Sequence, residues 1–267
     1  MEYRPRLNKG QNDIIMAAKG NSEIKSYLVL GCVHVPFQNR IIMDGIYKMM
    51  QAYDFDGIVL NGDFLDMGSL SEYEKGKINK TGITLEEEYE EGNIVLDKFD
   101  SLLRNDAERV FLFGNHCARY HRWKADVNNS KYGNLMNPVD ALKLKERGYK
   151  VFEDYQDDHY ELGSLQIFHG FYYNVHSAKK HLDVFRRNVL YNHTHRVQMY
   201  REGDFCAWNA GYLGNVNAPC FNYASRAMKS AWANAFAIVH LDKDRHHVDI
   251  VNCVKDSFVY NGVKYGS

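Results

Sequence analysis

The stretch SYLVLGCVHVPF, residues 26–37, begins with an apolar run and ends in a loop that carries Cys32 and His34. A short apolar run that stops at a glycine is typical of a buried strand. A thiol and an imidazole two residues apart, just beyond a strand end, favour a metal site because both side chains bind divalent ions. Similar residues after other apolar runs would complete such a site.

The chain has 267 residues, of which 45% are apolar, and a formal net charge of −1. This length predicts one large α/β domain over residues 25–267, preceded by a peripheral N-terminal arm at residues 1–24. The near-zero charge excludes a strong overall field for holding duplex DNA. Because there is no signal-peptide pattern and no apolar run of bilayer length, we expect a cytoplasmic protein without membrane contact.

Five cysteines occur, at positions 32, 117, 206, 220 and 253, without any C-x-x-C spacing. An odd number with this spacing argues against a disulfide framework and against a zinc ribbon, and it predicts reduced thiols. Cys206, Cys220 and Cys253 are expected to pack in the core.

Apolar runs alternate with helical patterns in the first half of the chain. Strand-like runs occupy residues 27–30, 57–60 and 109–113, and helical patterns occupy residues 40–52 and 85–104. This alternation predicts parallel strands with helical crossovers. In the second half, short alternating segments predict a second, largely antiparallel sheet that includes residues 149–154, 236–242 and 246–253, with one helix at 178–187.

Five apolar runs end in residues that can bind metal ions or transfer protons. These residues are Cys32 and His34, then Asp63 and Asp66, then Asn115 and His116, then His169, and finally His193 and His195. The loop after each strand of a doubly wound sheet lies at the crevice along the carboxyl ends of the strands. Carboxylates and imidazoles suit divalent ions, and two ions about 4 Å apart can share one carboxylate. The set is large enough for two ions.

The order of these motifs resembles the calcineurin-like metallophosphoesterase superfamily, whose pattern is Asp-x-His, Gly-Asp-x-x-Asp, Gly-Asn-His-Asp/Glu, a lone His and Gly-His-x-His. More narrowly, it resembles the compact phage and prophage branch, through His34-Val-Pro-Phe, Arg119, a Lys-rich helix after His169-Gly170, and Trp232. The resemblance covers residues 26–242 and is unspecific for substrate. It implies an α/β fold, a four-layer α/β/β/α sandwich of two mixed sheets flanked by helices.

The resemblance also implies roles for these residues. Cys32, His34, Asp63 and His195 would surround one divalent ion, and Asp63, Asn115, His169 and His193 the other, with Asp63 as the bridge. His116 falls where the family keeps an imidazole that donates a proton to the leaving oxygen or steadies charge on the phosphoryl group. Asp66 falls where some relatives orient that imidazole, with loop capping as its alternative role.

The sequence departs from the family pattern at three positions. Cys32 and Cys117 stand where the family has acidic residues, and Asn192 where it has glycine. A thiolate is softer than a carboxylate, so the two ions are expected to be Mn, Zn or Fe, with a shift toward Zn or Fe. A weakened first ion site, an inactive scaffold, and an oxidative pairing of Cys32 with Cys117 stay open. The change at Asn192 is expected to be mild because Asn tolerates a left-handed backbone.

The implied chemistry is attack of metal-bound hydroxide on a phosphate ester at a dinuclear site. We favour a phosphodiesterase or nuclease acting on nucleotides or nucleic-acid ends, because Arg119, Lys179 and Lys180 are suited to guide a nucleotide or a single strand. Tyr172, Tyr173 and Trp123 are candidates to stack on a base. The alternatives are a small-molecule phosphomonoesterase and, as a non-enzyme, a metal-poor scaffold that binds a protein. The sequence does not predict the oligomeric state.

Overall fold

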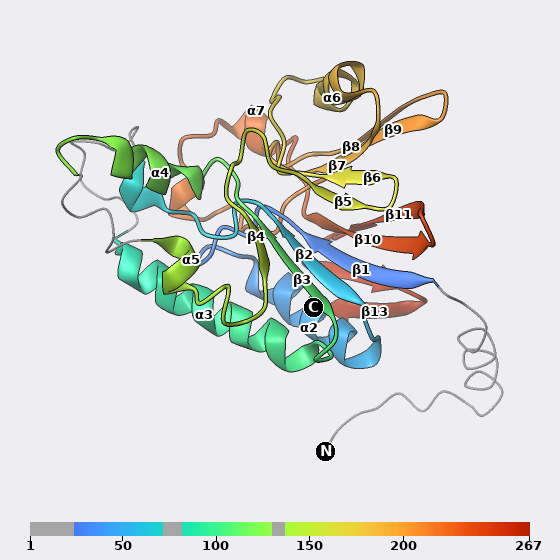
Figure 1. Ribbon diagram of the computed structural model, residues 1–267, viewed down its shortest axis with the longest axis horizontal. Helices are drawn as coiled ribbons and strands as arrows, with labels where there is room; N and C mark the ends of the chain where they lie inside the picture. The colour runs from blue at the N-terminus through green and yellow to red at the C-terminus, as the bar shows by residue number, and fades with distance from the viewer. Residues whose placement is uncertain (1–23, 72–81, 130–136) are drawn as a thin grey trace.

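The computed structural model describes residues 24–71, 82–129 and 137–267, so the arm predicted at residues 1–24 lies, except for Ile24, outside the described residues. Two mixed sheets packed face to face between helices form an α/β/β/α sandwich (Figure 1). This confirms the fold class expected from the sequence. No helix in these ranges combines the length and the apolar character needed to cross a bilayer.

The first sheet has six strands in the order β11-β10-β1-β2-β3-β4. Four of them run parallel: β1 (Lys25–Leu30), β2 (Gly57–Asn61), β3 (Glu108–Leu112) and β4 (Lys150–Phe152). β10 (Ala235–Asp242) pairs antiparallel with β1, and β11 (Arg245–Asn252) pairs antiparallel with β10. The helices α2 (Arg40–Ala52) and α3 (Leu85–Leu102) make the crossovers between the first three parallel strands.

Both crossover helices begin at polar caps. The Asn39 side chain accepts a hydrogen bond from the Ile42 N–H at the start of α2, and Thr84 and Glu87 form a capping box at the start of α3. These caps satisfy N–H groups that have no partner inside the helix. The helices therefore begin near the positions that the sequence pattern predicts.

The second sheet has five strands in the order β5-β6-β7-β9-β8. Its strands are β5 (Tyr160–Leu162), β6 (Leu165–Ile167), β7 (Asn188–Tyr191), β8 (Val197–Glu202) and β9 (Phe205–Ala210). β6, β7 and β9 are parallel neighbours, and only the edge strands are antiparallel, so the expectation of a largely antiparallel sheet is wrong. The strands at residues 150–152, 235–242 and 245–252, which we expected here, belong to the first sheet. Alternation within a short strand does not specify its partner, because strand preference depends on the surrounding packing.

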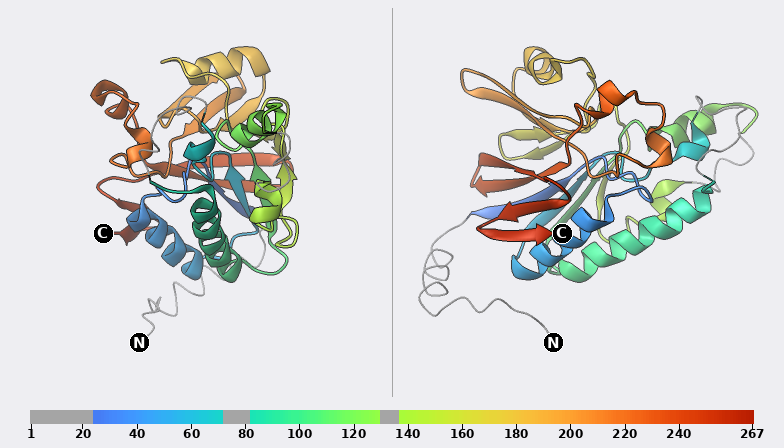
Figure 2. Two further views of the ribbon diagram at one scale, coloured as in Figure 1. Left: turned by 90° about the vertical axis from the view of Figure 1, so that its left-hand side faces the viewer. Right: turned by 180° about the vertical axis from the view of Figure 1, so that it is seen from behind.

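Alternation along β1 separates two layers of core. Leu28 and Leu30 pack with the apolar residues of α2 and α3, whereas Tyr27 and Val29 pack between the sheets, where Ile167 meets them. Successive side chains of a strand point to opposite faces, so one strand serves both layers. Helix α6 (Ser177–Phe185), close to its predicted range, covers the outer face of the second sheet, and Figure 2 shows it opposite α2 and α3.

Smaller elements complete the structure. They are α4 (Ala118–Ala125), α5 (Pro138–Ala141), α7 (Arg226–Lys229), the 3₁₀ turns η1 (Gly68–Leu70) and η4 (Pro219–Phe221), and the hairpin β12 (Ser257–Tyr260) and β13 (Val263–Gly266). The hairpin packs against α2. None of these helices was predicted, because each is short and lacks a repeated apolar face.

Candidate metal centre

The loops that come after β1, β2, β3, β6 and β7 meet at one edge of the sandwich. β1, β2 and β3 are parallel neighbours, as are β6 and β7, so their carboxyl ends lie together in each sheet. Backbone hydrogen bonds join the loops: the Cys32 N–H donates to the Gly62 carbonyl at 3.0 Å, and the Asn192 N–H donates to the His169 carbonyl at 3.0 Å. Two sets of side chains gather here, an outer set and an inner set.

The outer set is Asp63, Asn115, His169 and His193, whose donor atoms converge. His169 Nε2 lies 3.1 Å from Asp63 Oδ2 and 3.0 Å from Asn115 Oδ1. His193 Nδ1 lies 3.0 Å from the same amide oxygen and 3.3 Å from His169 Nε2. Ligands about 2.1 Å from a tetrahedral ion stand about 3.4 Å from one another, so these separations are close to what one cation requires.

The proton position on His169 shows that the outer set fits a cation. His169 Nδ1 lies 3.2 Å from the Asn61 carbonyl oxygen, which can only accept, so Nδ1 carries the proton of the neutral ring. Nε2 then presents a lone pair toward the oxygens of Asp63 and Asn115. A divalent ion bound between these acceptors would offset their mutual repulsion. A histidine that binds a metal through one nitrogen usually donates the N–H of its other nitrogen to a carbonyl or carboxylate, as His169 does here.

The inner set is Cys32, His34 and His195, whose donor atoms lie within 4.8 Å of one another. His34 Nδ1 lies 3.2 Å from Asp66 Oδ1 and donates to it, so His34 Nε2 offers a lone pair. That Nε2 faces His195 Nε2 at 3.1 Å, and His195 Nδ1 has no hydrogen-bond partner among the described residues. The close approach of the His34 and His195 rings, and the buried His195 nitrogen that lacks a partner among the described residues, are also compatible with a bound cation.

Cys32 points into the site. Its Sγ accepts a hydrogen bond from the His193 N–H at 3.2 Å and also groups with Asp63 and His169, so it faces both sets. Burial and the neighbouring Asp63 carboxylate raise the pKa of the Cys32 thiol well above its usual value. A protonated thiol must lose its proton to become a ligand, so metal binding at Cys32 would release a proton.

The backbone of the site is unusual, because five candidate ligands have φ between +47° and +60°. They are Cys32, His34, Asp63, His193 and His195. Left-handed backbone costs about 1 kcal/mol or more for a residue with a Cβ and concentrates at functional sites. The surrounding fold therefore holds these five residues in a backbone conformation that their own side chains disfavour.

Two glycines allow the loops to approach one another. Gly62 has φ +74°, and a Cβ at this position would overlap the His169 ring. A Cβ at Gly114 would overlap the Asp63 carboxylate. The glycines of the Gly-Asp and Gly-Asn-His motifs are therefore required by close packing around Asp63.

Asn192 differs from expectation. The positive φ angles of this loop fall on His193 and His195, not on Asn192, so tolerance of a left-handed backbone does not explain this asparagine. Its amide instead accepts from Asn61 Nδ2 and donates to the Gly211 carbonyl, both at 2.9 Å. Asn192 therefore joins strand ends of the two sheets beneath the site.

His116 lies beside Asp63 with its ring held on both sides. His116 Nδ1 lies 2.6 Å from the Asp66 carbonyl oxygen, and Arg119 Nη2 lies 3.2 Å from His116 Nε2. A carbonyl only accepts and a guanidinium only donates, so the neutral ring carries its proton on Nδ1 and accepts at Nε2. His116 Nε2 is 3.9 Å from Asp63 Oδ2, and the donor atoms of His116, Asp63 and His34 also form a candidate ligand group.

The Asp66 carboxylate contacts two imidazoles. Its Oδ1 lies 3.2 Å from His34 Nδ1 and 3.4 Å from His116 Nδ1. Burial acts to raise the pKa of Asp66, but hydrogen bonds from His116 and His34 outweigh it and hold that pKa well below its usual value. Asp66 is therefore placed to orient both rings.

The three predicted substrate-binding residues are placed differently from one another. Arg119 Nη1 donates to the Asp66 carbonyl at 2.8 Å, so its guanidinium is engaged beside His116. Lys179 pairs with Asp183 at 2.8 Å on α6, and Lys180 Nζ lies 5.4 Å from the centre of the Tyr172 ring. Among the contacts of the described residues, neither lysine reaches a candidate ligand.

Cys117 lies outside both sets. Its thiol is buried in the apolar cluster beneath α3, with Tyr89 and Tyr120, and it belongs to none of the candidate ligand groups found among the described residues. Burial raises the pKa of the Cys117 thiol to about 12. The oxidative pairing with Cys32 stays a hypothesis.

Sequence reasoning missed the aromatic residues around the inner set. The ring of Tyr212 stacks on His195 at 4.7 Å, and Trp232 and Phe221 approach the same imidazole edge-on at 4.6 Å and 5.5 Å. On the outer side, the Tyr155 ring lies 5.9 Å from His169, and Arg122 Nη2 donates to the Asn115 carbonyl at 3.1 Å. The aromatic residues among them belong to no spacing motif, and only the late Trp232 drew notice, as a family sign, whereas Arg122 was expected beside the site because it follows His116 closely.

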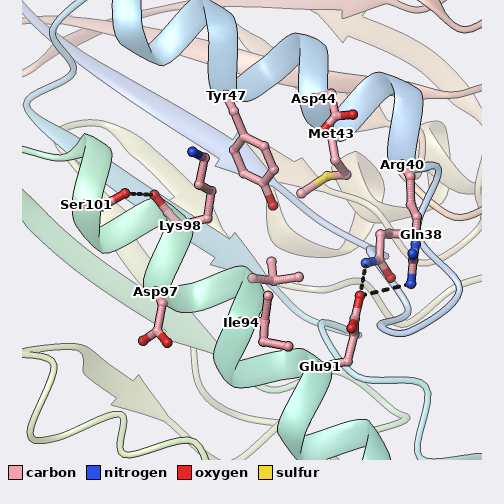
Figure 3. Close-up of a pocket in the computed structure, with 11 residues that line it drawn as sticks. Gln38, Arg40, Met43, Asp44, Tyr47, Glu91, Ile94, Asp97, Lys98 and Ser101 are labelled. Atoms are coloured by element: carbon pink, nitrogen blue, oxygen red, sulfur yellow. Dashed lines mark hydrogen bonds and ion pairs between the residues drawn. The ribbon is translucent and has the colours of Figure 1, made fainter.

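A separate groove of about 600 Å³ lies between α2 and α3. Figure 3 shows Tyr47, Lys98 and Glu91 along it, with Glu91 bonded to Gln38 and Arg40 at 3.2 and 3.1 Å. None of its lining residues belongs to the outer or inner set.

Comparisons with known proteins report fold similarity only. No protein-family model and no curated protein sequence matches this chain. Among solved structures, Vps29 from Chaetomium thermophilum is 11% identical with a TM-score of 0.49, covering 91% of this chain and 98% of that one. Zinc-complexed Vps29 from Entamoeba histolytica is 11% identical with a TM-score of 0.47, over 88% and 96%. A predicted phosphoesterase from Streptococcus pneumoniae is 15% identical with a TM-score of 0.34, over 90% and 95%.

Proposed function

We propose that this chain is a metal-dependent phosphoesterase of the calcineurin-like superfamily that holds two divalent ions. One observation carries the proposal: loops from five strand ends of two sheets bring seven ligand-type side chains together, and the His169 lone pair faces the oxygens of Asp63 and Asn115. A set built only for hydrogen bonding would pair donors with acceptors instead.

Bound divalent ions would supply a nucleophile at neutral pH and offset charge on the phosphoryl oxygens. The chain's own residues would then place the ester. The side chain of His116 is 11% exposed, which makes it reachable from solvent, and its Nε2 lies beside Asp63. A proton taken up at Nε2 would replace the hydrogen bond from Arg119 and allow this ring to donate to the leaving oxygen, while the Asp66 carbonyl keeps the ring oriented through Nδ1.

We propose a phosphodiester of a nucleotide or of a nucleic-acid end as the substrate. Arg122 lies beside Asn115, and the aromatic ring of Tyr155 lies beside His169, so a cationic and an aromatic side chain both border the outer set. Aromatic rings stack on bases, and guanidinium groups bind phosphates. Lys179 and Lys180, farther away on α6, would attract the substrate through its charge.

A chromogenic bis-aryl phosphate diester, compared with its monoester in Mn²⁺, Zn²⁺ and Fe²⁺, tests the proposal. We expect the diester to be hydrolysed faster. Preference for the monoester would favour a small-molecule phosphomonoesterase. No turnover of either ester with any ion would overturn the enzymatic proposal.

The thiol at Cys32 favours one further candidate, a metal-poor scaffold that binds a protein in the same place. Its burial raises the pKa of Cys32, which opposes ligation by the thiolate. Element analysis of protein purified without added metal separates these possibilities. About two equivalents of Zn or Fe would support the two-ion centre, and less than one equivalent would favour the scaffold.

A further inference from the structure

Glu88 is a buried acid within a solvent-facing acidic run. Helix α3 opens with LEEEYEE, residues 85–91, in which Glu86, Glu87 and Glu90 are exposed but Glu88 is only 1% exposed. Glu88 shares the buried face of the helix with Leu85 and Gly92, which are three and four residues away, and its neighbour Tyr89 is also buried. Glutamate is rarely buried without specific partners, so its contacts point to its role.

The partners of Glu88 are backbone N–H groups of the turn that carries Asp66. Glu88 Oε2 accepts from the Met67 N–H at 2.5 Å, and the Gly68 N–H also hydrogen-bonds to this carboxyl group. Met67 has φ +49°, a conformation that needs support in a non-glycine residue. Burial, then the charge of Asp66, raises the pKa of Glu88 to about 8, so glutamine closely mimics its protonated form.

Arg119 holds the carbonyl groups of the same turn. Its Nη1 donates to the carbonyl oxygens of Asp66 at 2.8 Å and Met67 at 3.3 Å. The carboxyl group of Glu88 therefore binds the N–H groups of the turn, and the guanidinium of Arg119 binds its carbonyl groups. Both peptide groups that flank Met67 are engaged by these two side chains.

The position of this turn decides how two imidazoles are held. The Asp66 carbonyl oxygen accepts from His116 Nδ1, and the Asp66 carboxylate accepts from His34 Nδ1. Displacement of the turn would remove the acceptor that keeps the His116 proton on Nδ1. A ring freed in this way would exchange its proton between the two nitrogens.

We propose that Glu88, with Arg119, clamps the turn formed by Asp66, Met67 and Gly68 and thereby sets the proton position and orientation of His116. Glu88 is a positioning residue, because it contacts neither the candidate ligands nor His116 directly in the described contacts. Its effect on rate rests on the proposed function, whereas its effect on the imidazole does not.

The test is imidazole ¹H–¹⁵N spectroscopy of the full chain in EDTA, with the His116 signal identified by its loss in His116→Ala. We expect His116 to be a single Nδ1–H tautomer in the wild type and in Glu88→Gln, which keeps an acceptor oxygen. Glu88→Met fills the same volume without an acceptor, so a mixture of tautomers is expected. Glu91→Met, on the same helix but bonded to Gln38 and Arg40, is the matched control and should leave His116 unchanged.

An unchanged His116 spectrum in folded Glu88→Met would overturn the clamp. Should Glu88→Met fail to fold, Glu88→Asp provides the same test, because its shorter side chain withdraws the acceptor while keeping a carboxyl group. In the metal-loaded enzyme, we expect kcat of Glu88→Met to fall about 10-fold or more with KM within about twofold. Absence of wild-type turnover would count against the proposed function, and the spectra would still decide the clamp.

Discussion

The inner and outer sets differ in burial and in chemistry. Cys32, His34 and His195 are at most 4% exposed and lie under Tyr212, Phe221 and Trp232, whereas Asn115 and His193 of the outer set are partly exposed. The inner set has a sulfur ligand, and the outer set has an amide oxygen. We therefore expect the inner ion to be a softer metal that exchanges slowly, and the outer ion to exchange readily with the medium.

The largest effect is expected at Asp63, which belongs to the outer set and whose carboxylate also groups with Cys32 and with His34 of the inner set. Asp63→Ala removes the proposed bridge, so both ions and all measurable turnover should be lost. Element analysis and the diester assay measure the two losses. The surface variant Asp183→Ala is the control, and retention of two ions in Asp63→Ala would show that the sets are independent.

A smaller effect is expected at His116, which we assign to neither set. His116→Ala should keep both ions and lower kcat about 10²- to 10⁴-fold, because a proton donor at the leaving oxygen is lost. Metal content and kcat are measured on the same sample. Loss of an ion would instead make His116 a ligand, in the group that it forms with His34 and Asp63.

Cys32 distinguishes the inner set from the outer set. Cys32→Ala should lose about one equivalent of metal and keep the other, since His34 and His195 alone bind weakly. Cys32→Asp should restore two ions and shift the preference toward Mn²⁺, because a carboxylate is a harder ligand. Cys206→Ala, a buried cysteine of the second sheet, is the control. Two ions bound in Cys32→Ala would show that the thiolate is not a ligand.

The smallest effect is expected on α6. The double variant Lys179→Ala and Lys180→Ala should lower kcat/KM about two- to fivefold at low ionic strength and leave kcat unchanged, because distant charges act on substrate encounter. The difference should disappear in about 1 M salt, where screening is strong. Lys243→Ala, at the turn between β10 and β11, is the matched control. A fall in kcat would place these lysines in contact with the reacting ester.

The sequence predicted the parallel first half, and the ligand-type residues that it singled out lie together in the structure. Each candidate comes after an apolar run, and parallel strands bring their ends together, so local pattern was enough to expect convergence. The local pattern failed where a strand pairs with a strand that is distant in the sequence. β10 and β11 alternate like strands of the second sheet, but they pair beside β1 in the first sheet. Glu88 was missed for a similar reason, because an acidic run in a helix resembles a solvated face and only the fold shows which member is buried.

Asn192 and Gly31 together limit how this site can evolve. The Asn192 side chain occupies the space that a Cβ at position 31 would need, while its amide bonds to Asn61 and Gly211. A larger residue at position 31 is therefore tolerated only after position 192 has become smaller. We expect homologues to show correlated substitutions at these two positions, with the change at 192 preceding the change at 31 along each lineage.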